Sequence, residues 1–476
     1  MSPHVRRRRR VRRGDPRWPA RSGSDPATPA STLRWLSLGA AALFAAFATY
    51  GSWVPLEIHI VPLDVAIARF SQTPLIPLHR ASRTDFVTNV LLFMPIGFFL
   101  VGALAGRTRA AAVAWLAPVT ALCLGLSVAI EFGQIFVSGR TPSWNDVVAE
   151  TLGAALGAGA WLLAGPDVLD WIARLARADS SRTDTLWRLL GIYTAAWVLL
   201  GVLPLDFTIR PQELAQKLRA GRIVLEPFGG PATLSDNIGV VLMALPIGGF
   251  GLLLGMRRRS EWPLAFALLF GGALTSSVEF AQLLAFSRTA DVTDLFMNMS
   301  GVALGAWALG RGLERDMLSP DTSVRLWPLG ALALWCVVLG VRHWSPFDFA
   351  LSADMVKARL PIMFQVPFRS YYWGMPLNSL AEAMTKVLLS IPVGILLQLT
   401  WSPRHRLGRI LHTAVIVAAA AVIFLAIEFG QLLVPSRVPD QTDVYIGIGA
   451  AMAGMAISRL LTRRRAGGAG GGGHSL

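Results

Sequence analysis

One set of four polar residues occurs three times in the chain, with the same spacing each time. In each set a glutamine follows a glutamate by three positions, an arginine follows it by nine and an aspartate by fifteen. The sets are Glu131, Gln134, Arg140 and Asp146; Glu279, Gln282, Arg288 and Asp294; and Glu428, Gln431, Arg437 and Asp443. Repetition at a fixed spacing is typical of an internal repeat, so we expect three copies of one structural unit.

The chain is far more apolar than a soluble protein. Hydrophobic residues make up 53% of its 476 residues and charged residues 15%, with a mean hydropathy of +0.51. These values exclude a disordered chain and an ordinary soluble domain, and they indicate a multi-span membrane protein. A span needs about 20 apolar residues to cross roughly 30 Å of hydrocarbon. Twelve segments are candidates: 35–54, 87–105, 112–137, 146–164, 187–205, 237–255, 262–286, 294–310, 326–343, 380–400, 410–434 and 443–461.

The repeated glutamates fall inside these apolar segments. A charge at that depth is costly in lipid, so by default it faces the protein interior or water and has a partner. We therefore expect an all-α polytopic bundle of about 12 transmembrane helices, built as three tandem four-helix repeats. The expected division is a disordered basic cytoplasmic arm (1–34), repeats at 35–170, 185–315 and 326–461, and a disordered Gly-rich tail (466–476).

The placement of the positive charges, whose net value is +15, is better explained by membrane topology than by nucleic-acid binding. Arginines concentrate before the first expected span and after the even-numbered spans, as in Arg257, Arg258 and Arg259. This positive-inside pattern predicts an inner-membrane protein with both termini in the cytoplasm. The loops 55–86 and 206–236, which we expect outside, also carry arginine or lysine. No nucleic-acid-reading fold is visible, so membrane lipids and not nucleic acids are the expected surroundings.

The sequence carries no signature of a metal or cofactor site. Cys123 and Cys336 both lie in expected spans, where a free cysteine behaves as a small apolar residue. The seven histidines show no metal-ligand spacing, and none recurs between the repeats. We therefore expect no disulfide, no zinc site, no thiol nucleophile and no cofactor.

Further features recur around the polar sets. The first span of each copy ends in a proline, an apolar residue and an acid, as in Pro346-Phe347-Asp348. The amphipathic stretch that follows, clearest at 211–218, predicts either a short helix on the outer membrane surface or an ordered loop. Small residues four apart in the fourth span, such as Gly301 and Gly305, allow close helix packing.

The second span of each copy opens with an acid, ten residues before a proline that should kink the helix near mid-membrane. The pairs are Asp85 with Pro95, Asp236 with Pro246, and Glu382 with Pro392. The acid, the glutamate, the arginine and the aspartate thus occupy the same, non-cytoplasmic end of each copy. This predicts three polar clusters that open to the outside, or one composite site if the copies face each other.

These features resemble the VanZ-like family of bacterial membrane proteins. The resemblance rests on the pattern acid-x3-Asn-x-Leu-x3-Pro-x-Gly from Asp85 to Gly97, followed by Glu-x2-Gln, Arg, Asp and a Gly-rich span. The family unit is one four-helix domain, and three such units would cover residues 35–461. The family takes its name from a protein linked to resistance to the glycopeptide teicoplanin. The resemblance implies a membrane location, an outward-facing polar site and a cell-envelope role, but no defined reaction.

The three copies depart from the family pattern in different ways. Val240 and Lys386 stand where the first copy has Asn89. Glu150 and Gly447 stand where the second copy has Asn298. If these asparagines matter, no single copy is complete. The copies then either divide the work between them, or one or two sites have decayed.

We expect the recurring polar residues to bind a ligand from the envelope. Arginine holds carboxylate or phosphate groups in bidentate fashion, while glutamate and glutamine exchange hydrogen bonds with hydroxyls or amides. A lipid-linked sugar-peptide precursor or a glycopeptide antibiotic matches this chemistry. The candidate ligand-binding residues are Asp85, Asn89, Glu131, Gln134, Arg140, Asp146, Asp236, Glu279, Gln282, Arg288, Asp291, Asp294, Asn298, Glu382, Glu428, Gln431, Arg437, Asp440 and Asp443.

Two other interpretations of the same residues stay open. In a structural one, Glu131 pairs with Arg140, Gln134 bonds nearby backbone, and Asp146 caps the fourth span. In an enzymatic one, Glu131 with Asp146 or Asp85 acts as an acid/base pair on a lipid head group. No Walker, H-E-x-x-H or G-x-S-x-G motif supports catalysis. The units have parallel topology, which disfavours a transporter built on inverted repeats.

Overall fold

The computed structural model describes residues 30–75, 80–106, 108–177, 182–203, 206–230, 232–315, 324–372, 376–403 and 405–462. The basic arm as far as residue 29 and the Gly-rich tail lie outside these residues, while α1 already begins at Ala30. Twelve long helices run through the described chain: α1 (Ala30–Trp53), α3 (Arg80–Ala105), α4 (Arg109–Gln134), α5 (Trp144–Arg177), α6 (Arg182–Val202), α8 (Leu234–Arg257), α9 (Pro263–Leu284), α10 (Val292–Glu314), α11 (Trp327–Trp344), α14 (Pro376–Thr400), α15 (Arg406–Gln431) and α16 (Gln441–Thr462).

Eleven of these helices are long and apolar enough to cross a membrane, which confirms a polytopic helical bundle. Twelve spans were expected, and among the described long helices α11 is the one that does not meet the length and hydropathy criterion. This helix has 18 residues and ends in Arg342, His343 and Trp344. Its counterparts α1 and α6 meet the same criterion. The polar last turn of α11 thus distinguishes the first helix of the third repeat from the first helices of the other two repeats.

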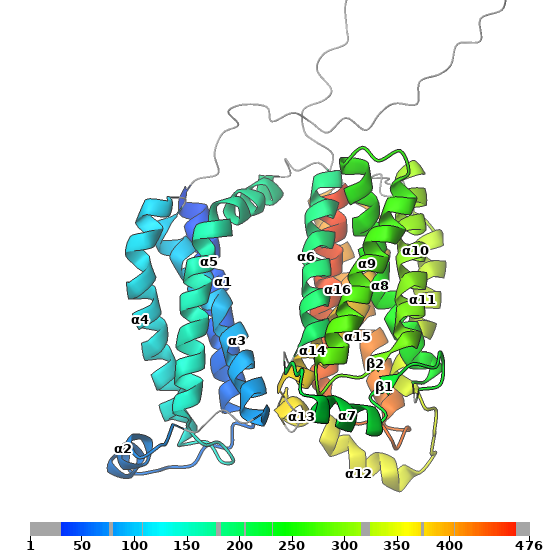
Figure 1. Cartoon of the computed structure of the whole chain (residues 1–476). Coiled ribbons are helices and arrows are strands. Elements are labelled where there is room, and N and C mark those ends of the chain that lie inside the picture. The colour runs from blue at the N-terminus through cyan, green and yellow to red at the C-terminus, as the bar shows by residue number, and fades with distance from the viewer. Residues whose placement is uncertain are drawn as a thin grey trace, which may run out of the picture.

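The long helices form three units of four. The first unit is α1, α3, α4 and α5; the second is α6, α8, α9 and α10; the third is α11, α14, α15 and α16. In Figure 1 the first unit stands beside the other two, which pack against each other. The start of α1 and the end of α16 lie at one end of the molecule.

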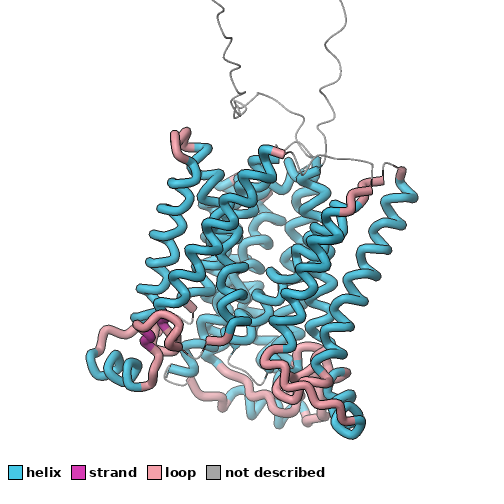
Figure 2. The backbone as a smooth tube through the Cα atoms, turned by 90° about the vertical axis from the view of Figure 1, so that its right-hand side faces the viewer, coloured by secondary structure: helices cyan, strands magenta, loops and turns pink. Residues whose placement is uncertain are grey.

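Four short helices lie at the opposite end, below the long helices in Figures 1 and 2. They are α2 (Leu63–Ser71), α7 (Pro211–Arg219), α12 (Ala353–Met363) and α13 (Arg369–Tyr372). We call this end the short-helix end. It is the end at which the expected polar clusters lie, because the repeated glutamate and aspartate flank the turn between the third and fourth helices of each unit.

The second and fourth helices of each unit pack in close contact through small residues. A Cβ added to Gly97, Gly248 or Gly394 would collide with a backbone carbonyl of the partner helix. The partner carbonyls are those of Ala154, Val302 and Ala451. Each of these glycines comes two residues after the helix proline, and the helix continues across that proline. The predicted fourth-helix small residues make the matching contacts, since a Cβ added to Gly157, Gly305 or Gly454 would meet a carbonyl of the second helix.

The segment after the first helix lies against the end of the third helix. Backbone hydrogen bonds of 2.8 Å join them in every unit: His59 to Phe136, Thr208 to Leu284, and Ala350 to Leu433. The two strands of the described chain, β1 (Ile223–Val224) and β2 (Ala290–Asp291), add a short parallel pair in the second unit. The amphipathic stretches are helical, at α2, α7 and α12, which answers the helix-or-loop question. Their position on a membrane surface stays a prediction.

Candidate functional site at the short-helix end

In the first and third units the repeated glutamate is buried, and both of its oxygens are engaged by neighbours. Glu131 and Glu428 are each 1% exposed. One carboxylate oxygen accepts a hydrogen bond of 2.9 Å from the glutamine three residues later. The other accepts from the backbone N–H twelve residues later, that of Ser143 at 2.6 Å and that of Asp440 at 3.0 Å. The glutamate therefore joins the end of the third helix to the start of the fourth.

The second unit keeps the glutamate contact but uses its glutamine differently. Glu279 accepts from the backbone N–H of Asp291, as its counterparts do. Gln282 instead donates to the carbonyl of Gly201, in the last turn of α6, at 3.0 Å. In the third unit His343 occupies the position of Gly201. Its ring nitrogen Nδ1 lies 3.4 Å from the side-chain nitrogen of the corresponding glutamine.

The repeated arginine caps the first helix of its unit. Cations stabilise the carbonyl-rich C-terminus of a helix. The bonds run from Arg140 to the carbonyls of Val54 (2.8 Å) and Gly51 (2.7 Å), from Arg288 to Leu203 and Leu200 (both 2.6 Å), and from Arg437 to Ser345 (2.6 Å). In the second unit Glu279 and Arg288 thus contact separate backbone groups. The counterpart of the glutamate–arginine pair in the structural interpretation is replaced in this unit by two separate contacts to backbone.

A second cation caps the third helix in two of the units. Lys217 of α7 is fully buried and donates to the carbonyls of Gln282 (2.5 Å), Leu283 (3.0 Å) and Ala285 (2.6 Å). Arg359 of α12 donates to those of Leu432 (3.2 Å), Val434 (2.8 Å) and Arg437. Burial lowers the pKa of the Lys217 ammonium, and the nearby Asp206 carboxylate acts in the opposite direction.

The first unit holds its short helix by apolar packing instead. Arg69, at the α2 position that corresponds to Lys217, is exposed. Ala66 is buried against Ile135. The ring of Phe70 meets that of Phe132 edge-on, with centroids 5.6 Å apart. The same short helix is thus fixed by a cation that caps the third helix in two units and by apolar and aromatic contacts in the other.

The residue before the fourth helix also has a structural task. Asp291 and Asp440 each accept a 2.7 Å bond from the backbone N–H two residues later. Those residues are Thr293 and Thr442, whose hydroxyls accept the backbone N–H of Phe228 (2.9 Å) and Phe368 (2.8 Å). Side-chain oxygens at this position satisfy helix N–H groups that otherwise lack partners. The two aspartates therefore fix the loop that follows the short helix.

The aspartate of the fourth helix has different partners in the three units. In the first unit Asp146 is hydrogen-bonded to the Asn89 side chain. In the third unit the Asn89 position is Lys386, which lies 2.6 Å from Asp443. In the second unit that position is a valine, which offers the corresponding aspartate no polar contact. One substituted position on the second helix therefore sets the chemistry around this acid.

Lys386 organises a polar network that the other units lack in their described parts. Its ammonium lies 2.8 Å from Glu382 and donates to the Tyr371 hydroxyl at 2.9 Å. That hydroxyl donates to Asp443 at 2.7 Å. Burial, with the adjacent Asp443 charge, raises the pKa of Tyr371, so the hydroxyl stays protonated and keeps its donor role. The side chains of Lys386 and Asp443 are 18% and 7% exposed.

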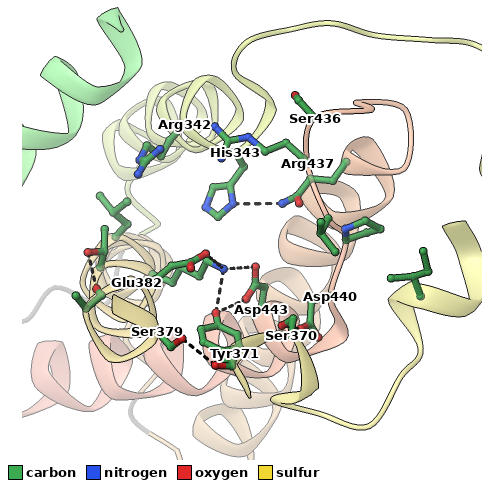
Figure 3. Close-up of a pocket in the computed structure, with 18 of the residues that line it drawn as sticks. Arg342, His343, Ser370, Tyr371, Ser379, Glu382, Ser436, Arg437, Asp440 and Asp443 are labelled. Carbon is green, nitrogen blue, oxygen red and sulfur yellow. Dashed lines mark hydrogen bonds and ion pairs between the residues drawn. The ribbon is translucent and has the colours of Figure 1, made fainter. Parts of the chain in front are cut away.

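A cavity of about 970 Å³ opens beside this network. Known ligand pockets span roughly 300–1,000 Å³, so its size suits a substantial polar ligand. Figure 3 shows Arg342, His343 and Arg437 across the cavity from Tyr371 and Asp443. The other polar lining residues are Gln365, Ser370, Ser379, Glu382, Thr385, Lys386, Gln431, Ser436 and Asp440. All of the lining belongs to the third unit and its short helices.

The three units match a single family. The model of the VanZ/LLP1 family matches residues 36–165, 190–311 and 329–462, which together make up most of the chain. The chain belongs to the VanZ/LLP1 family. Each match falls on one four-helix unit, which confirms three tandem VanZ-like units. No curated protein and no solved structure gives a significant match to the chain.

The structure places the candidate residues of the three VanZ units at the short-helix end, with unequal surroundings. Asp236 forms a capping box with Thr233 and lies 3.7 Å from Arg342 of the third unit. Asn298 is buried in α10. Of the nineteen candidates, five line the cavity: Glu382, Gln431, Arg437, Asp440 and Asp443. Those of the first two VanZ units lie outside it.

Several lining residues of this VanZ cavity were not among the sequence candidates. The sequence did single out Lys386, because it replaces the asparagine of the family pattern. That replacement suggested a lost binding site and not a new polar network. Arg342 and His343 were less conspicuous in the sequence, where they appear only as two polar residues at the end of an apolar helix. Tyr371 and Ser370 lie in α13, and neither recurs in the repeat, so the repeat pattern gave no reason to select them.

Proposed function

We propose that this VanZ-family protein recognises a cell-envelope ligand through the cavity of its third unit. The observation that carries the proposal is the 970 Å³ polar cavity at the short-helix end. On the positive-inside pattern, that end faces away from the cytoplasm, in the inner membrane. The ligand classes are a lipid-linked sugar-peptide precursor or a glycopeptide antibiotic. The second class would connect the protein to teicoplanin-type resistance.

The contacts of the repeated residues support one assignment of roles. Both oxygens of Glu131 and of Glu428 are occupied by protein donors, and Arg140 and Arg288 each bond two carbonyls. These residues specify the fold of each unit. Recognition is then the task of side chains that reach the third-unit cavity. Among these, Arg342 and Arg437 suit phosphate or carboxylate groups because guanidinium binds such anions through paired hydrogen bonds.

The test is ligand-induced stabilisation of the purified full-length protein in detergent. Teicoplanin and a lipid-linked disaccharide-peptide precursor are added separately, and the melting temperature is followed against ligand concentration. We expect at least one ligand to raise it. Arg342→Gln should weaken the affinity for that ligand by about tenfold, which corresponds to the loss of one charge-assisted contact.

Arg258→Gln is the matched control. Arg258 is exposed and follows the last residue of α8, at the end of the molecule remote from the cavity. Its removal should leave ligand binding at the wild-type level. If neither ligand changes the melting temperature, or if both variants bind like wild type, recognition through this cavity is wrong.

A further inference from the structure

The third-unit cavity has two walls of opposite charge. The first, which we call the cationic wall, consists of Arg342, His343 and Arg437. The second, which we call the acidic wall, consists of Glu382, Asp440, Asp443 and Lys386 with Ser370 and Tyr371. Three carboxylates and one ammonium leave the acidic wall with two formal negative charges, which equal in number the two guanidinium charges opposite.

Each wall is held by a different neighbouring unit. On the cationic wall, Arg342 lies 3.7 Å from Asp236, which begins α8 of the second unit. The adjacent Ser235 donates from its hydroxyl to the carbonyl of Val341 at 3.4 Å. The second unit thus contacts the last turn of α11 through two consecutive residues. These contacts direct the Arg342 side chain from outside the unit that owns the cavity.

The α13 part of the acidic wall is held by the first unit. Glu57 lies 3.1 Å from Arg369, the first residue of α13. The Tyr50 hydroxyl donates to the carbonyl of Pro367 at 2.9 Å. Phe368, which has a positive φ of 66°, packs its ring edge-on against Tyr50, with centroids 6.1 Å apart.

These contacts position the two residues of α13 that face the cavity. Ser370 bonds to Asp440, and Tyr371 bonds to Asp443 at 2.7 Å. Because α13 has only four residues, it depends on tertiary contacts for its stability. The first unit supplies the ion pair and the hydrogen bond just described, so it positions Ser370 and Tyr371, the α13 part of the acidic wall.

We propose that the cavity takes a ligand with separate anionic and cationic groups, and that the first and second units position the wall for each. The anionic group, a phosphate or carboxylate, lies against the cationic wall. The cationic group, a primary ammonium, lies against the acidic wall. This inference rests on the proposed function and specifies its ligand class. Glu57 and Asp236 are positioning residues, since they act through Arg369 and Arg342.

Three small probes separate the two charges. Phosphoethanolamine carries both groups, glycerol phosphate only the anion, and ethanolamine only the cation. Their affinities are measured by calorimetry on the full-length protein in detergent. We expect phosphoethanolamine to bind at least about tenfold more tightly than either single-charge probe, because two oppositely charged walls discriminate through paired groups.

Two variants then test whether Asp236 and Glu57 position the walls. The readout is the preference among the three probes, which a general loss of stability would not change. Asp236→Asn should weaken phosphoethanolamine and glycerol phosphate about three- to tenfold, the size expected for a partly exposed ion pair, and leave ethanolamine unchanged. Glu57→Gln should weaken phosphoethanolamine and ethanolamine to the same extent and leave glycerol phosphate unchanged. Glu57→Asp keeps the charge and should restore wild-type selectivity.

Glu226→Gln is the control for both variants, because Glu226 is an exposed acid on a loop at the same end of the second unit and does not line the cavity. The proposal is overturned if a single-charge probe binds as tightly as phosphoethanolamine, or if both variants keep wild-type selectivity. Competition by phosphatidylethanolamine nanodiscs, but not by phosphatidylglycerol nanodiscs, would support the proposal with a lipid head group as the source. If phosphoethanolamine binds selectively but neither kind of nanodisc competes, the proposal is supported and the ligand is a soluble molecule.

The two proposals fail in different ways. If teicoplanin or the precursor binds through Arg342 but the probes show no preference for two charges, only the ligand class is wrong. If phosphoethanolamine binds selectively and neither envelope ligand binds, the two-charge cavity stands and the envelope ligand is wrong.

Discussion

The first and third units place the same aspartate at the start of the fourth helix and give it different partners. Asp146 meets the neutral amide of Asn89. Asp443 meets the Lys386 ammonium at 2.6 Å and the Tyr371 hydroxyl at 2.7 Å. A charged partner takes the place of an amide, and the large polar cavity opens on this side of the third unit. One substitution on a shared scaffold has therefore changed the local chemistry without altering the fold.

The second unit shows that the scaffold does not depend on this position. Val240 replaces the amide altogether, yet the unit keeps the glutamate contact to the fourth-helix backbone, its capping arginine and its close helix pair. The features common to all units are the ones that hold helices together. The surroundings of the fourth-helix aspartate, by contrast, differ between the units without changing that arrangement of helices, which separates fold specification from the candidate binding chemistry.

The largest effect should come from Lys386. Lys386→Val recreates the second-unit arrangement in the third unit and leaves Asp443, which is 7% exposed, without its cation. We expect a loss of about 3–5 kcal/mol in the free energy of unfolding, since a buried charge without its partner is strongly destabilising. Urea unfolding in detergent measures it.

Lys386→Asn is the matched comparison, because it recreates the first-unit arrangement and keeps a hydrogen-bond donor for Asp443. It should cost less than half as much as the valine. Val240→Asn, at the same position in the second unit, should not destabilise that unit. Equal losses for Lys386→Val and Lys386→Asn would show that the asparagine arrangement of the first unit cannot be transferred.

A smaller effect should distinguish the short helices of the first and second units. Lys217→Met leaves the carbonyls at the end of α9 without their buried donor, so the free energy of unfolding should fall by about 1.5–3 kcal/mol. Arg69→Met removes the exposed counterpart in α2 and should change it by less than about 0.5 kcal/mol. Thermal unfolding of both variants measures the contrast, and similar losses would contradict the buried-cap role of Lys217.

The smallest effect should come from the repeated glutamates. Glu131→Gln and Glu428→Gln keep an oxygen for the backbone N–H twelve residues later but bring an NH2 group toward the NH2 donor of Gln134 or Gln431. Each should lower the free energy of unfolding by about 1 kcal/mol, the typical value of one hydrogen bond. Glu279→Gln should lower it less, because Gln282 donates to Gly201 instead. Ligand binding should stay near wild type. A variant that folds like wild type but loses teicoplanin or precursor binding would give the glutamate a direct binding role instead.

The sequence predicted those parts of the site that depend on spacing along one helix or across one turn. The three-residue spacing places Glu131 and Gln134 on one helix face, but the interpretation that Gln134 bonds nearby backbone is wrong, because it bonds the Glu131 side chain. Backbone bonding is seen for the second-unit counterpart, Gln282. The close approach at Gly301 and Gly305 follows from their spacing, because small residues four apart let helices come into contact. The sequence did not predict that Arg140 would cap α1, because nothing in the spacing specifies which of several nearby acceptors a long side chain reaches.

The sequence alone determined the helical membrane class, the threefold repeat and the family, because apolar length and fixed spacing depend only on residues near each other in the chain. Only the tertiary structure showed the cavity of the third copy and what holds its walls. The contacts Glu57–Arg369 and Asp236–Arg342 join residues of different units. Such pairs form only when whole units pack together, and the repeat pattern, which is the same within each unit, contains no information about how units meet.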